Sequence, residues 1–395
     1  MAPDPLLVRD LSPLGDYVGP RDLLLADGHV LATDAEALAL GGSARTVDGR
    51  GLSAAPGFVE LQVNGVAGHD FTSEPGAMWA SDVHAALAAS GVTAFLPTVV
   101  TAPRGTVDGA LDACAAGSAT AGAPSPLGVH VEGPYLAPTR HGAHDPHLLR
   151  DPAGAEVARW LASGALRVLT LAPELPGALD VIESVVAGGA VASVGHTEAD
   201  AATTRRAIEA GARYATHLFN AMAPLTHREP GATGALLDDE RVTLGLIADG
   251  VHLDPAILRL VARRAPGRVT LVSDAMAAVG MGDGVHSLAG RSVTVRGGRA
   301  TLEDGTLAGS AAALDACLRF YADATGSWSA AIEAVTGTPS RLLGLEAARG
   351  PLRPGSVADV VLLDPNGRPR TTIIGGAVAW SAVSVGGGQG SASGS

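Results

Sequence analysis

Eight short apolar runs, several of them separated by helical patterns, occupy the middle of the chain and restrict its fold more than any other feature. They read FVELQVNG, VTAFLPTVV, LGVHVEGP, RVLTLAPE, AVASVGHT, YATHLFNA, VTLGLIADG and RVTLVSDAM. The helical segments include MWASDVHAALAAS, DAATTRRAIEAGA and AILRLVARRA. Buried strands that alternate with crossover helices predict a parallel sheet, and eight of them favour a (β/α)8 TIM-like barrel over residues 56–355. An open, doubly wound sheet is the rival, but no GxGxxG follows the first strands.

The two ends of the chain share a different texture, in which short apolar runs are broken by turns. Residues 1–55 look all-β, and ADGHV and VDGRG within them are typical of hairpins. The stretch PGSVADVVLLDPNGRPRTTIIGGAVAW repeats this texture near the other end. We therefore expect residues 1–55 and 356–385 to form one small β-sandwich domain. The Gly- and Ser-rich residues 386–395 are expected to be a flexible tail.

Composition excludes several classes of function. Of the 395 residues 47% are hydrophobic and 17% are charged, which suits a large packed interior. The formal charge of −13 argues against nucleic acid or an anionic membrane as the main partner. All 27 basic residues are arginines, so a Walker A lysine, a Schiff base and a carbamylated lysine that bridges two metals are impossible.

The expected location follows from the cysteines and from the hydropathy. Cys114 and Cys317 lie far apart and outside any CxxC motif, which fits a reducing cytoplasm. The segment MAPDPLLVRD does not read as a signal peptide. No apolar run reaches the ~18–20 residues that a membrane span requires.

Polar residues end several of the predicted strands, where the βα loops of a barrel converge. These residues are Glu132, His196, His217, Asn220, Asp249, His252 and Asp274. One carboxylate and two imidazoles, from Glu132, His196 and His217, make a three-ligand set typical of catalytic zinc. A bound metal lowers the pKa of water and polarises a carbonyl, and Asp274 is the candidate that moves the proton.

Each of these side chains alone also has a structural explanation. His196 precedes TEAD, in which Thr197 and Asp200 could form a capping box at the start of a helix. His217 could be a core histidine, Glu132 could accept turn amides, and Asp274 could be a helix N-cap. Together at one rim they are costly to bury unless something pairs them, which favours the metal site.

Four motifs, HVEGPYL, GHTEAD, THLFNAM and LVSDAM, give the chain a family resemblance. The chain resembles the N-acetylglucosamine-6-phosphate deacetylases of the amidohydrolase superfamily, from PGFVELQVNG to about PGSVADVVLLD. This resemblance implies a metal-dependent barrel beside a small β-domain and a homodimer. It also implies a reaction that removes acetate from N-acetyl-D-glucosamine 6-phosphate.

The resemblance also implies roles for individual residues. It makes Glu132, His196 and His217 the metal ligands, Asp274 the catalytic acid/base, and His144 of RHGAHDP a substrate-binding and catalytic histidine. The implied contacts to the sugar phosphate and to the acetyl pocket are Asn220, Ala221, Arg228, His252 and Leu307. In some members the arginine at position 228 crosses a dimer interface. By themselves, Arg228 could equally be a surface charge, His252 a buried histidine bonded to backbone, and His144 an ordinary loop histidine.

Gln62 and Asn64, at the end of the first barrel strand, predict the number of metals. Many barrels of the superfamily have His-x-His there and hold a second metal with it. Amide oxygens are weak zinc ligands compared with imidazole, so the second position should be vacant. We therefore expect one divalent ion per subunit, Zn²⁺ in the first instance with Fe²⁺ as an alternative.

Three other functions stay open at this point. The chain could deacetylate N-acetylgalactosamine 6-phosphate, or it could be another amidohydrolase such as a cyclic-imide hydrolase. The missing His-x-His and the missing lysine argue against the second. The chain could also be a non-catalytic barrel that binds metal or sugar phosphate, although such a protein has no need of Asp274.

Overall fold

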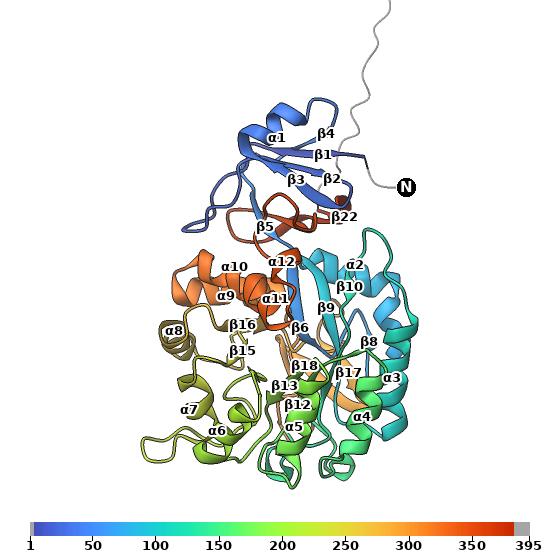
Figure 1. Cartoon of the computed structure of the whole chain (residues 1–395), viewed down its shortest axis with the longest axis vertical. Coiled ribbons are helices and arrows are strands. Elements are labelled where there is room, and N and C mark those ends of the chain that lie inside the picture. The colour runs from blue at the N-terminus through green and yellow to red at the C-terminus, as the bar shows by residue number, and fades with distance from the viewer. Residues whose placement is uncertain (1–3, 383–395) are drawn as a thin grey trace, which may run out of the picture.

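The computed structural model describes residues 4–382, which form a barrel with a small β-domain on one side of it (Figure 1). The predicted tail, 386–395, and residues 383–385 of the predicted β-domain lie outside the described residues. None of the described helices is both long and apolar enough to cross a bilayer.

All eight predicted barrel strands are present in the described chain and run parallel to one another. In spatial order they are β6 (Phe58–Val63), β9 (Val92–Val99), β11 (Val129–Glu132), β12 (Leu166–Leu171), β13 (Val191–Val194), β14 (Tyr214–Ala215), β15 (Thr243–Ile247) and β16 (Val269–Val272). Every residue of β6 and β9 is buried, as expected for strands covered on both faces. The prediction of a TIM-like barrel is confirmed, with the short β10 (Ser125–Pro126) added beside β9.

The barrel closes between β6 and β16 without a regular ladder. The backbone hydrogen bonds that join the two sides begin beyond the end of β16, where Asp274 N–H donates to the carbonyl of Gln62 at 3.0 Å and Asn64 N–H donates to that of Ala275 at 2.7 Å. The first strand and the last strand are thus joined next to the polar residues that were predicted to be functional.

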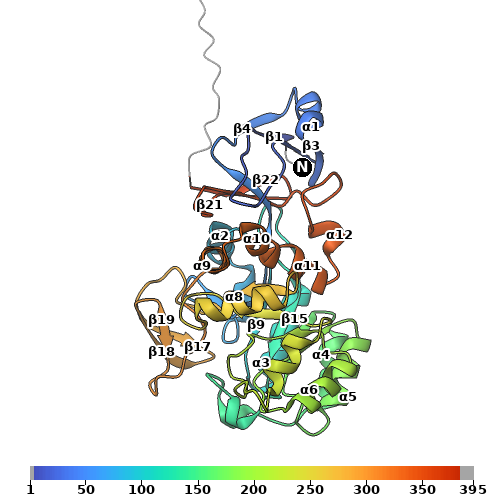
Figure 2. The same cartoon turned by 90° about the vertical axis from the view of Figure 1, so that its left-hand side faces the viewer.

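Helices cover the outside of the barrel (Figures 1 and 2). They are α2 (Ser81–Ala89), α3 (Arg104–Ala116), α4 (Gly154–Ala162), α5 (Ala178–Ala187), α6 (Ala201–Glu209), α7 (Gly231–Asp238), α8 (Pro255–Arg264), α9 (Leu314–Thr325), α10 (Trp328–Val335), α11 (Gly337–Leu342) and α12 (Glu346–Arg349). The predicted helices at 78–90, 200–212 and 256–265 correspond to α2, α6 and α8. The N-cap of α6 is Asp200, whose side chain accepts from Thr203 N–H, so the expected capping box with Thr197 is wrong.

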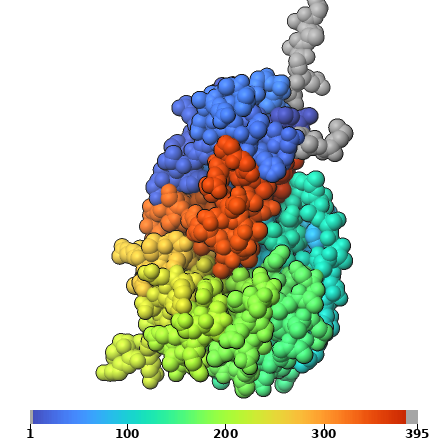
Figure 3. Space-filling view, in the orientation of Figure 1, coloured from blue at the N-terminus to red at the C-terminus, as the bar shows by residue number. Residues whose placement is uncertain are grey.

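The small β-domain is built from both chain ends, as predicted. One sheet has the order β3-β2-β1-β4, from β1 (Leu6–Arg9), β2 (Leu23–Ala26), β3 (His29–Thr33) and β4 (Arg45–Asp48). The other sheet joins β5 (Ser53–Pro56) to β20 (Val360–Leu363), β21 (Pro369–Ile374) and β22 (Ala377–Ser381). Figure 3 shows the blue N-terminal segment against the orange-red C-terminal segment at the surface.

Two expectations for residues 1–55 are wrong. The segment is not all-β, because α1 (Asp34–Leu40) follows β3 in a run of Ala, Leu and Glu, which are good helix formers. The turn VDGRG is not a hairpin. It leads from β4, which pairs in parallel with β1, to β5 in the other sheet. The hairpin at ADGHV is confirmed between β2 and β3.

Two small β elements were not predicted. A three-stranded sheet of β17 (Gly284–Leu288), β18 (Arg291–Arg296) and β19 (Arg299–Thr301) is inserted after the last barrel strand and projects from the barrel in Figure 2. A two-residue pairing joins β7 (Gly65–Val66) to β8 (His69–Asp70) after the first strand. Both insertions lie in βα loops, which form the rim of the barrel.

Apolar side chains from the barrel strands form a separate inner cluster. It contains Val59, Leu61, Ala94, Leu96, Val168, Tyr214, Ile247 and Val272. These residues precede the polar strand ends along each strand. The barrel interior is therefore packed below the rim, and the polar groups stand on a rigid apolar floor.

Candidate metal centre and acid/base site

The predicted ligands come from the ends of three neighbouring strands. Glu132 is the last residue of β11, while His196 and His217 stand two residues beyond β13 and β14. Both histidines have positive φ, 49° and 28°, as does Asp274 beyond β16, with 49°. Left-handed backbone is strained for residues other than glycine and tends to occur at functional sites. The chain turns sharply at these positions, which brings the side chains into the mouth of the barrel.

Glu132, His196 and His217 converge on one point. The Oε1 atom of Glu132 lies 2.9 Å from His217 Nε2 and 3.2 Å from His196 Nε2, and the two Nε2 atoms are 3.1 Å apart. The three residues are only 2%, 4% and 4% exposed. They are the one group of at least three His, Cys, Asp or Glu residues found close enough to hold a metal within residues 4–382.

The donor set fits a metal ion better than it fits a hydrogen-bond network. A tetrahedral ion with ligand distances of about 2.0–2.2 Å sets its ligand atoms about 3.3–3.6 Å apart, close to the spacing seen here. His196 Nδ1 lies 2.8 Å from the carbonyl of Arg140 and donates to it, so its Nε2 carries a free lone pair. Two imidazole nitrogens and a carboxylate oxygen that face one another, with little water access, are suited to share a cation.

Charge in the cluster favours a ligating carboxylate. Burial by itself raises the pKa of Glu132, but the adjacent imidazoles of His196 and His217 outweigh it and hold that pKa well below its ordinary value. Glu132 is therefore ionised at neutral pH, the form in which a carboxylate binds a metal.

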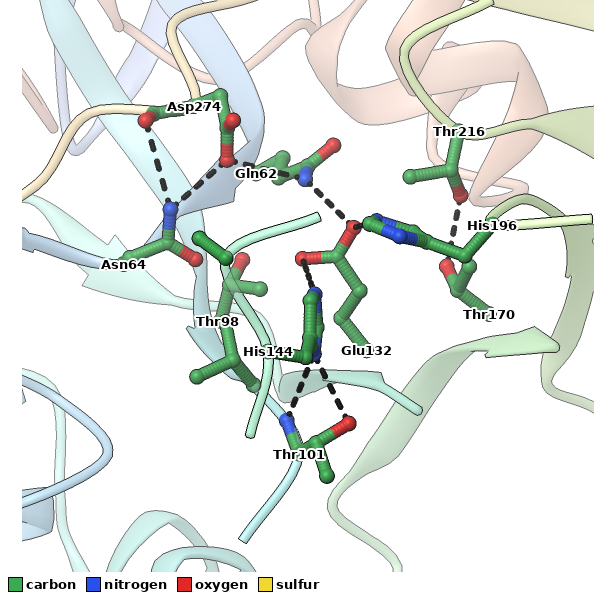
Figure 4. A network of polar contacts seen from close by, with 12 residues as sticks. Gln62, Asn64, Thr98, Thr101, Glu132, His144, Thr170, His196, Thr216 and Asp274 are labelled. Carbon is green, nitrogen blue, oxygen red and sulfur yellow. Dashed lines mark hydrogen bonds and ion pairs between the residues drawn. The ribbon is translucent and has the colours of Figure 1, made fainter. Parts of the chain in front are cut away.

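Asp274 is joined to this cluster through the amide of Gln62, and it also accepts from the amide of Asn64 (Figure 4). Asn64 Nδ2 donates to Asp274 Oδ1 at 2.7 Å, and Gln62 Nε2 donates to the same oxygen at 3.1 Å. Gln62 Nε2 also donates to Glu132 Oε1 at 3.1 Å. Burial, followed by the charge of Glu132, raises the pKa of Asp274 to about 6. A carboxyl group with that pKa is suited to accept and return a proton near neutral pH.

The hydrogen bonds of His144 determine its tautomer. The backbone N–H of Thr101 donates to His144 Nδ1 at 3.1 Å, and the Thr101 hydroxyl lies 2.8 Å from the same nitrogen. The ring proton is therefore on Nε2, which lies 3.8 Å from Glu132 Oε2. Burial and the nearby His196 lower the pKa of His144 to about 3, so the ring is neutral. His144 can donate one N–H toward the centre of the site (Figure 4).

A cavity of about 360 Å³ opens over these groups. Among the predicted residues, its lining includes Asn64, Glu132, His144, His196, His217, Asn220, Ala221, His252, Asp274 and Leu307. His252 is oriented by Asp249, whose Oδ2 lies 2.8 Å from His252 Nδ1. Arg228 is exposed on the loop before α7 and does not line the cavity. No helix begins at Asp274, so the helix N-cap explanation for that residue is excluded.

One charged residue of the cavity was not predicted from the sequence. Arg140 lines it and binds Glu198 through Nε at 2.6 Å. It is the only arginine in the described lining of the cavity. Arg140 directly precedes the histidines of RHGAHDP, in the loop after β11, but the local sequence does not distinguish a cavity arginine from a surface one.

The fold and the site together define a barrel hydrolase with one candidate metal centre. The family model described as "Amidohydrolase family" matches residues 54–379, and the chain belongs to that family. It is therefore a hydrolytic enzyme.

Relatives agree with the resemblance seen in the four motifs. The chain is 39% identical over 343 residues to N-acetylglucosamine-6-phosphate deacetylase of Bos taurus, covering 84% of each chain. It is 40% identical over 314 residues to N-acetylgalactosamine-6-phosphate deacetylase of Escherichia coli O157:H7, covering 78% of this chain and 83% of the other.

A solved structure agrees with the fold. N-acetyl-D-glucosamine-6-phosphate deacetylase of Mycobacterium smegmatis, as a mutant in complex with N-acetyl-D-glucosamine-6-phosphate, superposes with a TM-score of 0.86 at 35% identity. The match covers 95% of this chain and 99% of the other.

Proposed function

We propose that this enzyme hydrolyses the acetamide of N-acetyl-D-glucosamine 6-phosphate, giving D-glucosamine 6-phosphate and acetate. The observation that supports it most directly is the convergence of Glu132, His196 and His217 within 3.2 Å beside a buried Asp274. The relatives named for this reaction support the choice of substrate.

One divalent ion per subunit, Zn²⁺ or alternatively Fe²⁺, would be held by Glu132, His196 and His217. When bound, it lowers the pKa of water and polarises the acetamide carbonyl. Gln62 and Asn64 direct their N–H groups at Glu132 and Asp274. These N–H groups are engaged by the carboxylates, and amide oxygens are weak ligands for zinc, which supports a single ion.

Asp274 then moves the proton, and its two oxygens have different tasks. Oδ1 accepts both amide N–H groups, so Oδ2 is the oxygen that takes the proton from the attacking water. Oδ2 returns this proton to the nitrogen as the C–N bond breaks, because an unprotonated amine leaves poorly. The Nε2–H of His144 donates to the acetyl oxygen as negative charge develops on it.

The other cavity residues hold the sugar phosphate. Asn220, Ala221 and His252 line the cavity and are assigned to the phosphate, and Leu307, which also lines the cavity, is assigned to the acetyl group. We add Arg140 to the phosphate contacts, because it supplies a permanent positive charge there. Arg228 is assigned to the phosphate of the substrate that is bound to the neighbouring subunit of a homodimer. Binding energy at the phosphate would orient the distant acetamide.

Acetate release tests the proposal. The purified enzyme should release acetate from N-acetyl-D-glucosamine 6-phosphate, lose this activity with a chelator and regain it with Zn²⁺. A chelated enzyme that turns over at full rate would exclude the mechanism. We also propose the cytoplasm as the compartment, which the two free cysteines, Cys114 and Cys317, support.

A second candidate substrate is N-acetyl-D-galactosamine 6-phosphate. The identity of 40% to the Escherichia coli enzyme named for that sugar favours it as much as the Bos taurus match favours the gluco epimer. Comparison of kcat/KM for both sugars under the same conditions would decide between them. Absence of acetate release from either would instead point to a different substrate for this amidohydrolase.

A further inference from the structure

Glu60, in the middle of β6, is a buried acidic residue for which the proposed reaction has no task. Its side chain is only 1% exposed. Oε1 accepts from the backbone N–H of Gln62 at 3.0 Å, and Oε2 accepts from the backbone N–H of Ser273 at 3.0 Å. Gln62 belongs to β6 and Ser273 follows β16 directly, so the carboxyl group spans the two strands that close the barrel.

The carboxyl group of Glu60 lies where the regular backbone hydrogen bonds between β6 and β16 are missing. β6 and β16 are not paired as strands, and their direct backbone hydrogen bonds begin only at Asp274 and Asn64. Below those bonds, Glu60 supplies the acceptors for the N–H groups of Gln62 and Ser273. An apolar residue at position 60 would leave both N–H groups buried and unpaired.

The surroundings of Glu60 make a carboxylate costly unless it has this task. A cavity of about 20 Å³ beside it is lined mostly by apolar side chains, among them Val63, Leu87, Val92 and Leu314. Burial in this layer raises the pKa of Glu60 to about 8, so near pH 7 the side chain is mainly the neutral carboxyl group, whose two oxygens still accept the two N–H groups. A smaller apolar side chain would fit the layer with less desolvation.

The two N–H groups that Glu60 binds lie next to the acid/base site. Gln62 carries the amide that joins Glu132 to Asp274, and Ser273 immediately precedes Asp274 in the chain. One carboxyl group therefore holds the backbone on both sides of the hydrogen bond between Gln62 Nε2 and Asp274 Oδ1. A shift of either strand end would change the direction of Asp274 Oδ2.

We propose that Glu60 is a positioning residue for the reaction, which keeps the side chains of Gln62 and Asp274 in register across the barrel closure. This inference rests on the proposed function, because it assigns Asp274 as the proton carrier. It adds a residue that does not line the cavity of about 360 Å³ over the candidate metal centre.

The test is Glu60→Gln, which keeps the length of the side chain but replaces one acceptor by an NH2 group. We expect kcat to fall by about tenfold or more, as small displacements of catalytic groups do, while KM stays within about twofold. Metal content should stay at the wild-type value. Hydrogen exchange should become faster in the peptides that contain Gln62 and Ser273.

Two further variants separate positioning from general damage. Asp22→Asn alters another buried carboxylate that accepts a backbone N–H, from Asp10, but in the β-domain. It should leave kcat unchanged. Glu60→Asp keeps both oxygens but shortens their reach, so it should lower kcat as Glu60→Gln does.

The kcat values of these variants either support or overturn the positioning role of Glu60. Wild-type kcat in folded Glu60→Gln would overturn the inference, and so would an equal loss of kcat in Asp22→Asn. If neither Glu60 variant gave soluble protein, Glu60 would serve folding alone and the inference would also be wrong. Failure of the proposed function is distinguishable, because the wild-type enzyme would then release no acetate.

Discussion

Replacement of Asp274 by asparagine is the sharpest perturbation of the proposed chemistry. Asparagine keeps an oxygen at the Oδ1 position, where the amides of Gln62 and Asn64 donate, and places an NH2 group at Oδ2. The hydrogen bonds that hold the side chain should therefore survive. Only the ability to take up and return a proton is lost.

The expected magnitudes follow from these contacts. Loss of general acid–base catalysis lowers kcat by about 10²–10⁴, which corresponds to ~3–5 kcal/mol of transition-state stabilisation. The free energy of unfolding should change little in Asp274→Asn, because the amide donors of Gln62 and Asn64 keep their acceptor and the new NH2 group faces the open cavity. In Asp274→Ala both amide donors lose their acceptor, which should cost about 1–3 kcal/mol of stability in addition to the activity.

The assay measures acetate release at saturating substrate, together with metal content and thermal unfolding of both variants. Asp254→Asn is a suitable control, because Asp254 is an exposed N-cap of α8, outside the cavity. It should show wild-type kcat. Turnover of Asp274→Asn within a few-fold of the wild type would refute the assignment of Asp274 as the proton carrier.

Three further predictions address the remaining groups of the site. His144→Ala should lower kcat by about 10²–10³, because it removes the N–H that donates to the acetyl oxygen. Thr101→Val should lower kcat much less, because it keeps the backbone N–H that donates to His144 Nδ1. Gln62→His should raise bound metal above one equivalent, counted by elemental analysis, and an unchanged count would show that position 62 does not control metal number. The acid limb of the pH profile of kcat/KM should reflect the raised pKa of Asp274. Activity is present above that pKa and falls as the pH drops through it. The midpoint should lie at or below about 6, because a cation bound to Glu132 cancels part of the negative charge that raises the pKa of Asp274. A limb centred above pH 7 would contradict this.

The order of the barrel elements could be predicted because each strand is a local apolar run of the length that a buried parallel strand requires. The helix α1 and the crossing from β4 to β5 could not be predicted. Residues 34–40 have helix-forming composition, but their neighbours are β-like and dominated the interpretation. A turn such as VDGRG looks the same whether it joins two paired strands or two sheets, because the difference lies in the distant partners β1 and β20.

The candidate site, like the fold, could be predicted in part from the sequence. Glu132, His196, His217 and Asp274 were recognisable because each follows an apolar run directly, and strand ends of a barrel meet at one rim. Arg140 was missed because nothing in its local sequence distinguishes a cavity arginine from a surface one. The exposure of Arg228, which was expected at the substrate, depends on the path of a loop that no periodic pattern determines.

The amino-acid sequence alone thus determined the barrel, the identity of the polar groups at its rim and the absence of any lysine chemistry, because these depend on residue type and local spacing. Only the tertiary structure decided which atoms face one another: the tautomer of His144, the free oxygen of Asp274, and the bridge that Glu60 makes between the first and last strands. The physical reason is that hydrogen bonds act over about 3 Å, whereas the residues that form these bonds are as much as 213 positions apart in the chain.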